Sequence, residues 1–126
     1  MRFRQQLVKL EFEDLKIEVL PIWHYKLLIN GYKFGNSLAY ITDAKTIDED
    51  VIERIKGIDV LVINALRKED HISHMTLEAS LNVIDKIKPK RTYIIHMSHD
   101  MGLHEEVEKE LPEGVYFAYD GLVVKF

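Results

Sequence analysis

The sequence contains no cysteine among its 126 residues. This absence excludes a disulfide framework, a thiol nucleophile and zinc sites built on cysteine ligands. The sequence also lacks any run of about 18 apolar residues, the length that a helix needs to cross a bilayer. Near the N-terminus, Lys9 and Glu11 interrupt the apolar stretch that a signal peptide would need. We therefore expect a soluble, cytoplasmic protein that does not bind a membrane.

The chain has no excess of positive charge. Seventeen lysines and arginines stand against 21 aspartates and glutamates, which gives a formal net charge of −4. This balance argues against nucleic-acid binding through bulk positive charge, although it leaves room for a local basic patch. With 47% hydrophobic residues the chain can bury a sizeable core, and its length predicts a single domain over residues 1–126.

Histidine is the chemically versatile residue that the sequence does contain, with six copies. Because cysteine is absent, any transition-metal site in this chain must use imidazole and carboxylate ligands.

The first third of the chain has the pattern of β-strands. Residues 15–20 alternate apolar and polar side chains, as in a half-buried strand. Further short β-prone runs lie at residues 25–29, 32–34 and 38–42. Asn30-Gly31 predicts a tight turn between the first two of these runs, and Gly35-Asn36 predicts a weaker one before the third.

The rest of the chain alternates helices and strands. We predict helices at about residues 48–57, 76–88 and 103–110, and strands at residues 59–64, 92–95, 115–118 and 122–125. This order predicts an α/β fold with a mixed β-sheet. Crossovers of one hand place consecutive helices on the same face of the sheet. The strand at residues 60–63 is apolar on both faces, so we expect something else to cover the second face.

Several potential metal ligands lie at the ends of predicted strands or in the loops that follow them. They are His24, Asp43, His71, His74, His96 and His99. In open α/β sheets, loops from several strands converge beyond the carboxyl ends of the strands and form ligand sites there. Three imidazole or carboxylate groups presented by such loops would suit a first-row metal ion.

Each candidate also has an ordinary structural explanation. A lone histidine after a strand is more often a solvated or hydrogen-bonded loop residue than a ligand. Asp43 would serve equally well as a turn or cap residue before a helix, and His74 would lie in the first turn of a helix capped by Ser73. His104 falls on a charged helix face and is expected in solvent. Spacing alone leaves these alternatives open.

Six segments, taken together, carry a resemblance to a known family. They are PIWHYK at residues 21–26, GYKFG at 31–35, AYITD at 39–43, HISH at 71–74, IHMSH at 95–99 and AYDG at 118–121. The chain resembles the C-terminal half of metallo-β-lactamase-fold hydrolases from about residue 15 to its end. The most similar branch is that of cyclic phosphodiesterases related to the phosphoribosyl cyclic phosphate enzyme of phosphonate breakdown, which is akin to the tRNA 3′-processing endonucleases.

The resemblance implies a role for each matching residue. His24 would bind the first metal of a dinuclear zinc or manganese site, Asp43 would bridge both metals, and His96 would bind the second. His74 would lie near the substrate phosphate as a general acid, and His99 would orient a ligand. The implied substrate is a small phosphodiester, with a cyclic phosphate among the candidates.

The family's His-x-His-x-Asp-His motif, which supplies most of the metal ligands, is absent from this sequence. The resemblance therefore implies half of a four-layer αββα sandwich, in a fragment, a truncated gene product or a subunit. The chain would be part of a metal-dependent phosphodiesterase, the ligand-completing subunit of a two-chain enzyme, or a non-catalytic interaction module. We expect the chain alone to be inactive and to bind at most one metal ion, weakly. We also expect a second copy of the chain, or a missing N-terminal half, to cover its open sheet face.

Overall fold

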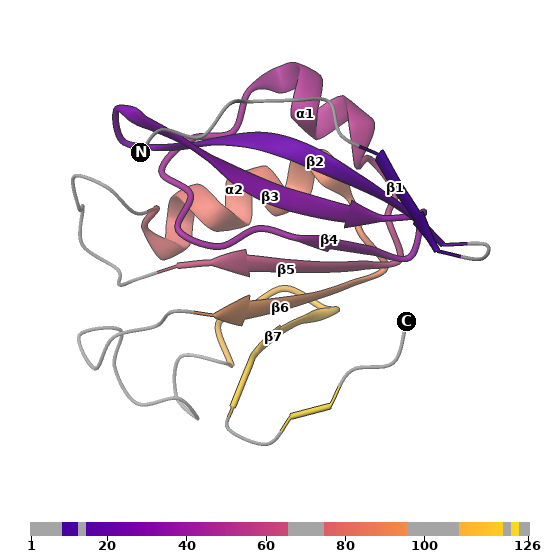
Figure 1. Ribbon diagram of the computed structural model, residues 1–126. Helices are drawn as coiled ribbons and strands as arrows, with labels where there is room; N and C mark the ends of the chain where they lie inside the picture. Colours follow the sequence, from indigo (N-terminus) through magenta and orange to yellow (C-terminus); the bar gives the residue numbers. More distant parts are fainter. Residues whose placement is uncertain (1–8, 13–14, 66–74, 96–108, 120–121, 124–126) are drawn as a thin grey trace.

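A computed structural model gives the fold and describes residues 9–12, 15–65, 75–95, 109–119 and 122–123. Within these residues, seven strands form one sheet in the order of the chain, and two helices pack against it (Figure 1). The elements are β1 (Lys9–Phe12), β2 (Leu15–His24), β3 (Leu27–Phe34), β4 (Leu38–Tyr40), α1 (Glu49–Arg54), β5 (Val60–Asn64), α2 (Leu77–Ile87), β6 (Arg91–Ile95) and β7 (Val115–Phe117).

The sheet is mixed. Strands β1 to β4 pair in antiparallel fashion, whereas β4 to β7 pair in parallel. The parallel connections from β4 to β5 and from β5 to β6 contain α1 and α2, and both move across the sheet in the same direction. Both helices therefore lie on one face, behind the sheet in Figure 1. The predicted α/β class, with a mixed sheet and helices on one face, is confirmed.

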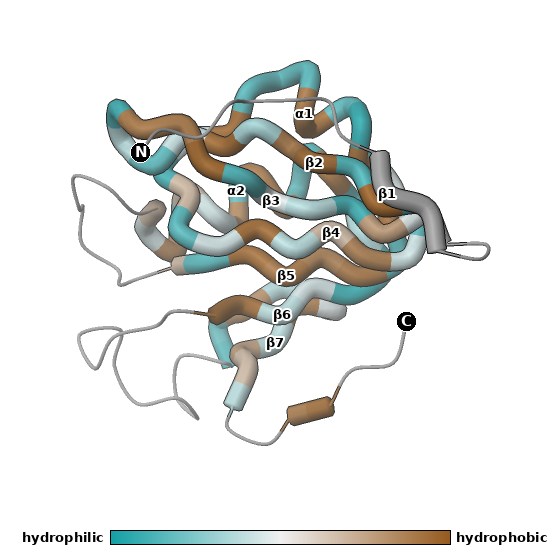
Figure 2. The backbone as a smooth tube through the Cα atoms, viewed as in Figure 1, coloured by the Kyte–Doolittle hydropathy of each residue, from teal (hydrophilic) through white to brown (hydrophobic). Residues whose placement is uncertain are grey.

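The core lies between the helices and this face of the sheet. Leu61 and Ile63 of β5 are fully buried, together with Ile94 of β6 and Phe117 of β7, and α2 adds Ile84. In Figure 2 the hydrophobic colour runs along much of β5, the strand in which we predicted apolar side chains on both faces. Burial of this cluster fixes the position of β5, and with it the residues that follow the strand.

The two described helices begin where the sequence predicts. The N-cap of α1 is Asp48, and Glu49 and Asp50 place negative charge in the first turn, where the helix dipole favours it. The N-cap of α2 is Thr76, whose hydroxyl accepts a hydrogen bond from the Ala79 amide at 3.1 Å. The alternative in which Ser73 caps this helix is therefore wrong.

The predicted turn at Asn30-Gly31 is wrong. Strand β3 runs straight through these residues, and the chain reverses instead at Tyr25-Lys26, where Tyr25 has a φ of 56°. The physical reason is a close approach. A Cβ atom on Gly31 would lie 3.1 Å from Cγ1 of Ile22 and 3.2 Å from the carbonyl oxygen of Tyr40. Glycine suits this position because a Cβ atom would crowd Ile22 and the β4 backbone by a few tenths of an ångström, and not because the chain turns.

Strand β1 was not predicted from the sequence, and the runs predicted at residues 25–29 and 32–34 form the single strand β3. Other differences concern the ends of elements. The run predicted at residues 38–42 is a strand only as far as Tyr40, and α1 ends at Arg54 rather than near Gly57. Leu122 and Val123 lie outside any strand, and the rest of that predicted strand falls outside the described residues. The same holds for most of the predicted helix at residues 103–110. The turn at Gly35-Asn36 is confirmed: Gly35 has a φ of 56°.

Replacement of Gly31 tests the close approach. We expect Gly31→Val to lower the free energy of unfolding by about 2–3 kcal/mol, because the new side chain must displace Ile22 or the β4 backbone. Urea denaturation measures this change. Asn36→Ala, at an exposed turn position, is the matched control and should stay within about 0.5 kcal/mol of the parent. Equal stability of both variants would contradict the packing at Gly31.

Candidate metal site

His24 is the last residue of β2 and is half-buried. Its Nδ1 atom lies 2.7 Å from the backbone carbonyl oxygen of Asp43. Because a carbonyl oxygen can only accept a hydrogen bond, Nδ1 must carry the proton and donate it. The lone pair of the neutral imidazole is then on Nε2. This second nitrogen is the one that can coordinate a metal ion, and a carbonyl partner at Nδ1 is the usual way to orient such a ligand.

Asp43 has a left-handed backbone conformation, with a φ of 56°. Two other non-glycine residues in the described part of the chain share this conformation: Tyr25 in the β2–β3 turn and Lys88 at the end of α2. Asp43 lies in a bend of the loop after β4 and not at the end of a helix, since Asp48 is the N-cap of the next helix. The alternative in which Asp43 caps a helix is therefore excluded. Aspartate tolerates this conformation better than most residues, and such outliers cluster at functional sites.

Asn64, at the carboxyl end of β5, holds the loop that contains Asp43. Its side-chain oxygen accepts a hydrogen bond from the Ala44 amide at 2.8 Å, and its side-chain nitrogen donates to the Ala44 carbonyl at 2.8 Å. The same carbonyl also accepts a hydrogen bond from the Met75 amide at 3.1 Å. Asn64 is fully buried, so these bonds are shielded from water. One amide side chain thus fixes the backbone next to Asp43.

The other side of this loop is joined to β2. The carbonyl oxygen of Trp23 accepts hydrogen bonds from the amides of Lys45 at 2.7 Å and Thr46 at 3.2 Å, and the Trp23 amide donates to the Thr46 carbonyl at 3.2 Å. The Trp23 indole also donates to Asp48 at 3.2 Å. The end of β2, the loop after β4 and the start of α1 therefore form one connected unit, which brings His24 and Asp43 together.

Sequence reasoning named His24 and Asp43 as candidate ligands and did not name Asn64. The structure places the ring of His24 in contact with the backbone carbonyl of Asp43, and the ligand roles of both residues stay a prediction. Asn64 could have been noticed as the one amide that ends an otherwise apolar strand. His74, His96 and His99, like His71 and His104, lie outside the described residues.

The donor atoms fit a divalent transition metal but do not complete a site. A neutral imidazole and a carboxylate are suitable ligands for zinc or manganese. Among the described residues, no group of three histidine, aspartate or glutamate side chains is close enough together to hold an ion. The described residues therefore offer His24 and Asp43 as candidate ligands, and a complete site would need further ligands.

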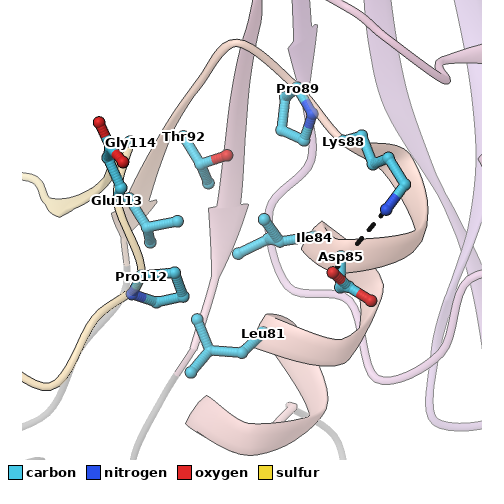
Figure 3. A pocket seen from close by; sticks show the side chains of 10 residues that line it. Leu81, Ile84, Asp85, Lys88, Pro89, Thr92, Pro112, Glu113 and Gly114 are labelled. Carbon is cyan, nitrogen blue, oxygen red and sulfur yellow. Dashed lines mark ion pairs between the residues drawn. The ribbon is translucent and has the colours of Figure 1, made fainter.

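A small pocket at the opposite end of the sheet is not a competing site. It has a volume of about 170 Å³ and lies between the end of α2 and the amino ends of β6 and β7 (Figure 3). Leu81, Ile84 and Val115 give it apolar walls, and two of the charged residues that line it, Asp85 and Lys88, face each other at 4.0 Å. Its lining contains no histidine, so it offers no metal-binding chemistry comparable to that at His24.

The described part of the chain contains no helix long and apolar enough to span a membrane.

The fold is that of an α/β domain in which a histidine at the end of β2 contacts the backbone of an aspartate in the loop after β4. A family model for the beta-lactamase superfamily domain matches residues 4–97, which is most of the chain. The chain therefore belongs to the beta-lactamase superfamily, with the metallo-β-lactamase fold that its sequence resembles. The described sheet and helices correspond to one half of the four-layer sandwich.

Relatives and solved structures extend this assignment. The octanoyltransferase of Porphyromonas gingivalis is 41% identical over 110 residues, which cover 86% of this chain and 22% of that protein. Ribonuclease Z of Borrelia garinii is 31% identical over 109 residues, which cover 75% of this chain and 34% of that enzyme. The structure of a new diphosphatase from the PhnP family matches 95% of this chain and 46% of its own, with a TM-score of 0.88 and 39% identity.

More distant structures share only the fold. Human tRNase Z, short form, has a TM-score of 0.72 at 15% identity. The chain spans only 22% of the octanoyltransferase, 34% of the ribonuclease Z and 46% of the diphosphatase chain. These proteins are therefore much longer than the segment that they share with this chain.

Proposed function

We propose that this chain carries part of a metal-dependent phosphodiesterase site, namely the ligands that complete a dinuclear centre. The observation that supports the proposal is the hydrogen bond between Nδ1 of His24 and the backbone carbonyl of Asp43, which would orient the His24 ring as a ligand and keep it near the Asp43 loop. Two of the similar proteins support the reaction class, because one is a ribonuclease and another a diphosphatase.

Each residue has a distinct role in this proposal. His24 would hold one ion through Nε2, His96 would hold the second, and Asp43 would serve as a ligand to both. His74 donates a proton to the leaving oxygen, and His99 orients a ligand. The family generally uses divalent metal ions; a pair of zinc or manganese ions would supply a hydroxide nucleophile and neutralise charge on the phosphate. The remaining ligands would belong to a polypeptide segment equivalent to the part of the relatives that this chain does not match.

The substrate in this proposal is a small phosphodiester, for which a cyclic phosphate is one candidate. Nucleic acid is a less suitable substrate because the chain has a net charge of −4. The expectation of a cytoplasmic location stays a prediction.

Metal binding by the chain itself tests the proposal. Trp23 is the single tryptophan of the sequence and directly precedes His24, so its fluorescence should be quenched when cobalt(II) binds there. We expect weak binding that saturates at no more than one ion per chain, because few ligands are present. His24→Ala should lower the affinity at least about tenfold, as loss of a properly oriented ligand does.

His104→Ala provides the matched control for this titration, since that histidine is expected in solvent and should leave the quenching unchanged. Tight binding of two ions per chain would contradict the proposal of a partial site. Equal quenching of the parent and His24→Ala would contradict the assignment of His24 as a ligand.

A further inference from the structure

The pocket of about 170 Å³ beside the end of α2 lies on the helix side of the sheet (Figure 3). The register places Thr92 of β6 beside Leu61 of β5, and Leu61 belongs to the core under the helices. Neighbouring residues on paired strands point to the same face, so the pocket is not part of the open face of the sheet. The ten residues that line it all belong to the described part of the chain, so its chemistry follows from their side chains.

The deeper walls of this pocket are apolar. On the side of α2 and its C-cap, the lining residues Leu81, Ile84, Asp85 and Lys88 have the i, i+3, i+4 and i+7 spacing of one helix face. Ile84 and, on the side of β7, Val115 are both buried. A preformed concave surface with apolar walls and few polar groups is typical of a small-molecule site.

Thr92 is the buried polar residue of this wall. It is 1% exposed, and in Figure 3 its hydroxyl points from β6 toward α2. The Thr92 amide donates a hydrogen bond to the carbonyl of Gly114 at 2.8 Å, whereas the hydroxyl makes no hydrogen bond with the part of the chain that the structure describes. A buried hydroxyl normally has a partner, so a ligand that supplies one gains a hydrogen bond here.

The charged residues that line the pocket are exposed and disfavour an anion. Asp85 and Lys88 face each other at 4.0 Å, and the third charged residue is Glu113. Two carboxylates against one ammonium group leave a net negative charge, which repels a phosphate group. This pocket is therefore not a second site for the phosphodiester proposed above.

The volume of the pocket suits a single ring. An apolar cavity of about 150 Å³ accepts benzene. At about 170 Å³, this pocket has room for a six-membered ring with one small substituent. Water fits the walls less well, because a buried water molecule makes about three hydrogen bonds and the buried side chains of this wall offer only the Thr92 hydroxyl.

We propose that this pocket binds a small neutral molecule that consists of one ring and one hydroxyl group, for which phenol is the simplest probe. The ring packs against Leu81, Ile84 and Val115, and the hydroxyl forms a hydrogen bond with that of Thr92. Such a ligand contacts α2, β6 and the start of β7 together, so its binding stabilises the folded chain. This inference goes beyond the proposed activity and does not depend on it.

Titration of the isotope-labelled chain with phenol, followed by the amide signals in nuclear magnetic resonance spectra, tests the proposal. Phenol should shift the signals of Thr92 and Gly114 until they saturate, with a Kd in the millimolar range, and should leave the signal of His24 in place. Thr92→Val should weaken phenol binding about three- to tenfold, as the loss of one hydrogen bond does. Toluene has the ring without the hydroxyl, so its affinity should be the same in Thr92→Val and in the parent.

Leu81→Trp tests the apolar wall, because the larger side chain fills the pocket and should abolish binding of both compounds. Asn82→Trp is the matched control: Asn82 is the next residue of the same helix, is exposed and does not line the pocket. It should bind phenol as the parent does. Circular dichroism shows which variants are folded, and the comparison of Leu81→Trp with Asn82→Trp decides the matter if Thr92→Val is not.

Three results would overturn the proposal. The first is a folded parent whose signals show no saturable shift with phenol, as expected for a pocket that holds water only. The second is a set of shifts centred on another part of the chain. The third is equal phenol affinity in the parent and in folded Thr92→Val, because the hydroxyl would then not anchor the ligand.

Discussion

Asn64→Ala is expected to lower the free energy of unfolding by about 3 kcal/mol. The substitution removes two hydrogen bonds of 2.8 Å to the backbone of Ala44, in a position that is fully shielded from solvent. It leaves the buried Ala44 amide without its partner and opens a cavity, and these two effects add. For a domain of this size such a loss is a large fraction of the total stability. Urea denaturation followed by circular dichroism measures it.

Thr92→Val is the matched control for Asn64→Ala. Thr92 is also buried, with 1% of its surface exposed, but its side chain makes no hydrogen bond within the described part of the chain. Valine has nearly the same shape as threonine. The free energy of unfolding of Thr92→Val should therefore stay within about 1 kcal/mol of the parent value or rise. If Asn64→Ala and Thr92→Val changed the free energy of unfolding equally, the hydrogen bonds from Asn64 to Ala44 would make no specific contribution to stability.

Asn64→Ala should also weaken metal binding. Ala44 is joined to Asp43, and the carbonyl of Asp43 holds the ring of His24, so freeing Ala44 loosens both proposed ligands. Under conditions where the variant is still folded, its affinity for cobalt(II) should fall about 10- to 100-fold. Thr92 lies near the amino end of β6, whereas Asn64 lies at the carboxyl end of β5. Thr92→Val should therefore leave the affinity for cobalt(II) unchanged. An unaltered affinity in folded Asn64→Ala would show that the hydrogen bonds from Asn64 to Ala44 do not position the site.

The fold could be predicted from the sequence wherever local pattern and burial agree. The alternating pattern of residues 15–20, the apolar run of β5 and the order of elements all indicate a mixed sheet with helices on one face. Gly31 could not be interpreted in this way. Its role depends on the distance to Ile22 and to the β4 backbone, which exists only once the strands have paired. The dipeptide Asn-Gly often marks the turn of a hairpin, whereas in this sheet its glycine allows two strands to approach closely.

The sequence named candidate residues for the site but could not show their geometry. Position at or after the end of a strand singled out His24 and Asp43, whose ligand roles stay a prediction. The sequence could not show that the backbone of Asp43, rather than its side chain, holds the imidazole, nor that its φ is positive. Asn64 acts only through contacts between segments twenty residues apart, so no local motif reveals it.

We expect phosphodiester hydrolysis only when the missing part of the site is supplied. The chain alone should hydrolyse a chromogenic phosphodiester no faster than the metal ion does by itself. A chimera in which this chain replaces the matched 46% of the PhnP-family diphosphatase should be active. The identity of 39% and the TM-score of 0.88 favour correct packing of the two parts. Turnover should need a divalent metal, and a chelator should abolish it.

Variants of the chimera separate the proposed roles. His74→Ala should lower kcat by about 10²–10⁴-fold, the usual contribution of a general acid, while metal content stays the same. His24→Ala should lower both metal content and turnover. His104→Ala should change neither. If the chain alone turned over substrate and His74→Ala abolished that activity, the proposal of a partial site would be wrong.

Metal-dependent phosphodiester hydrolysis by this chimera is the most direct measurement of the central claim. The account predicts turnover well above the metal-only background, with at least a 100-fold loss in His24→Ala, since that variant removes a metal ligand. A folded chimera that binds metal and shows no such turnover, or one whose activity is indifferent to His24→Ala, would contradict the assignment of this chain as the ligand-completing part of a phosphodiesterase.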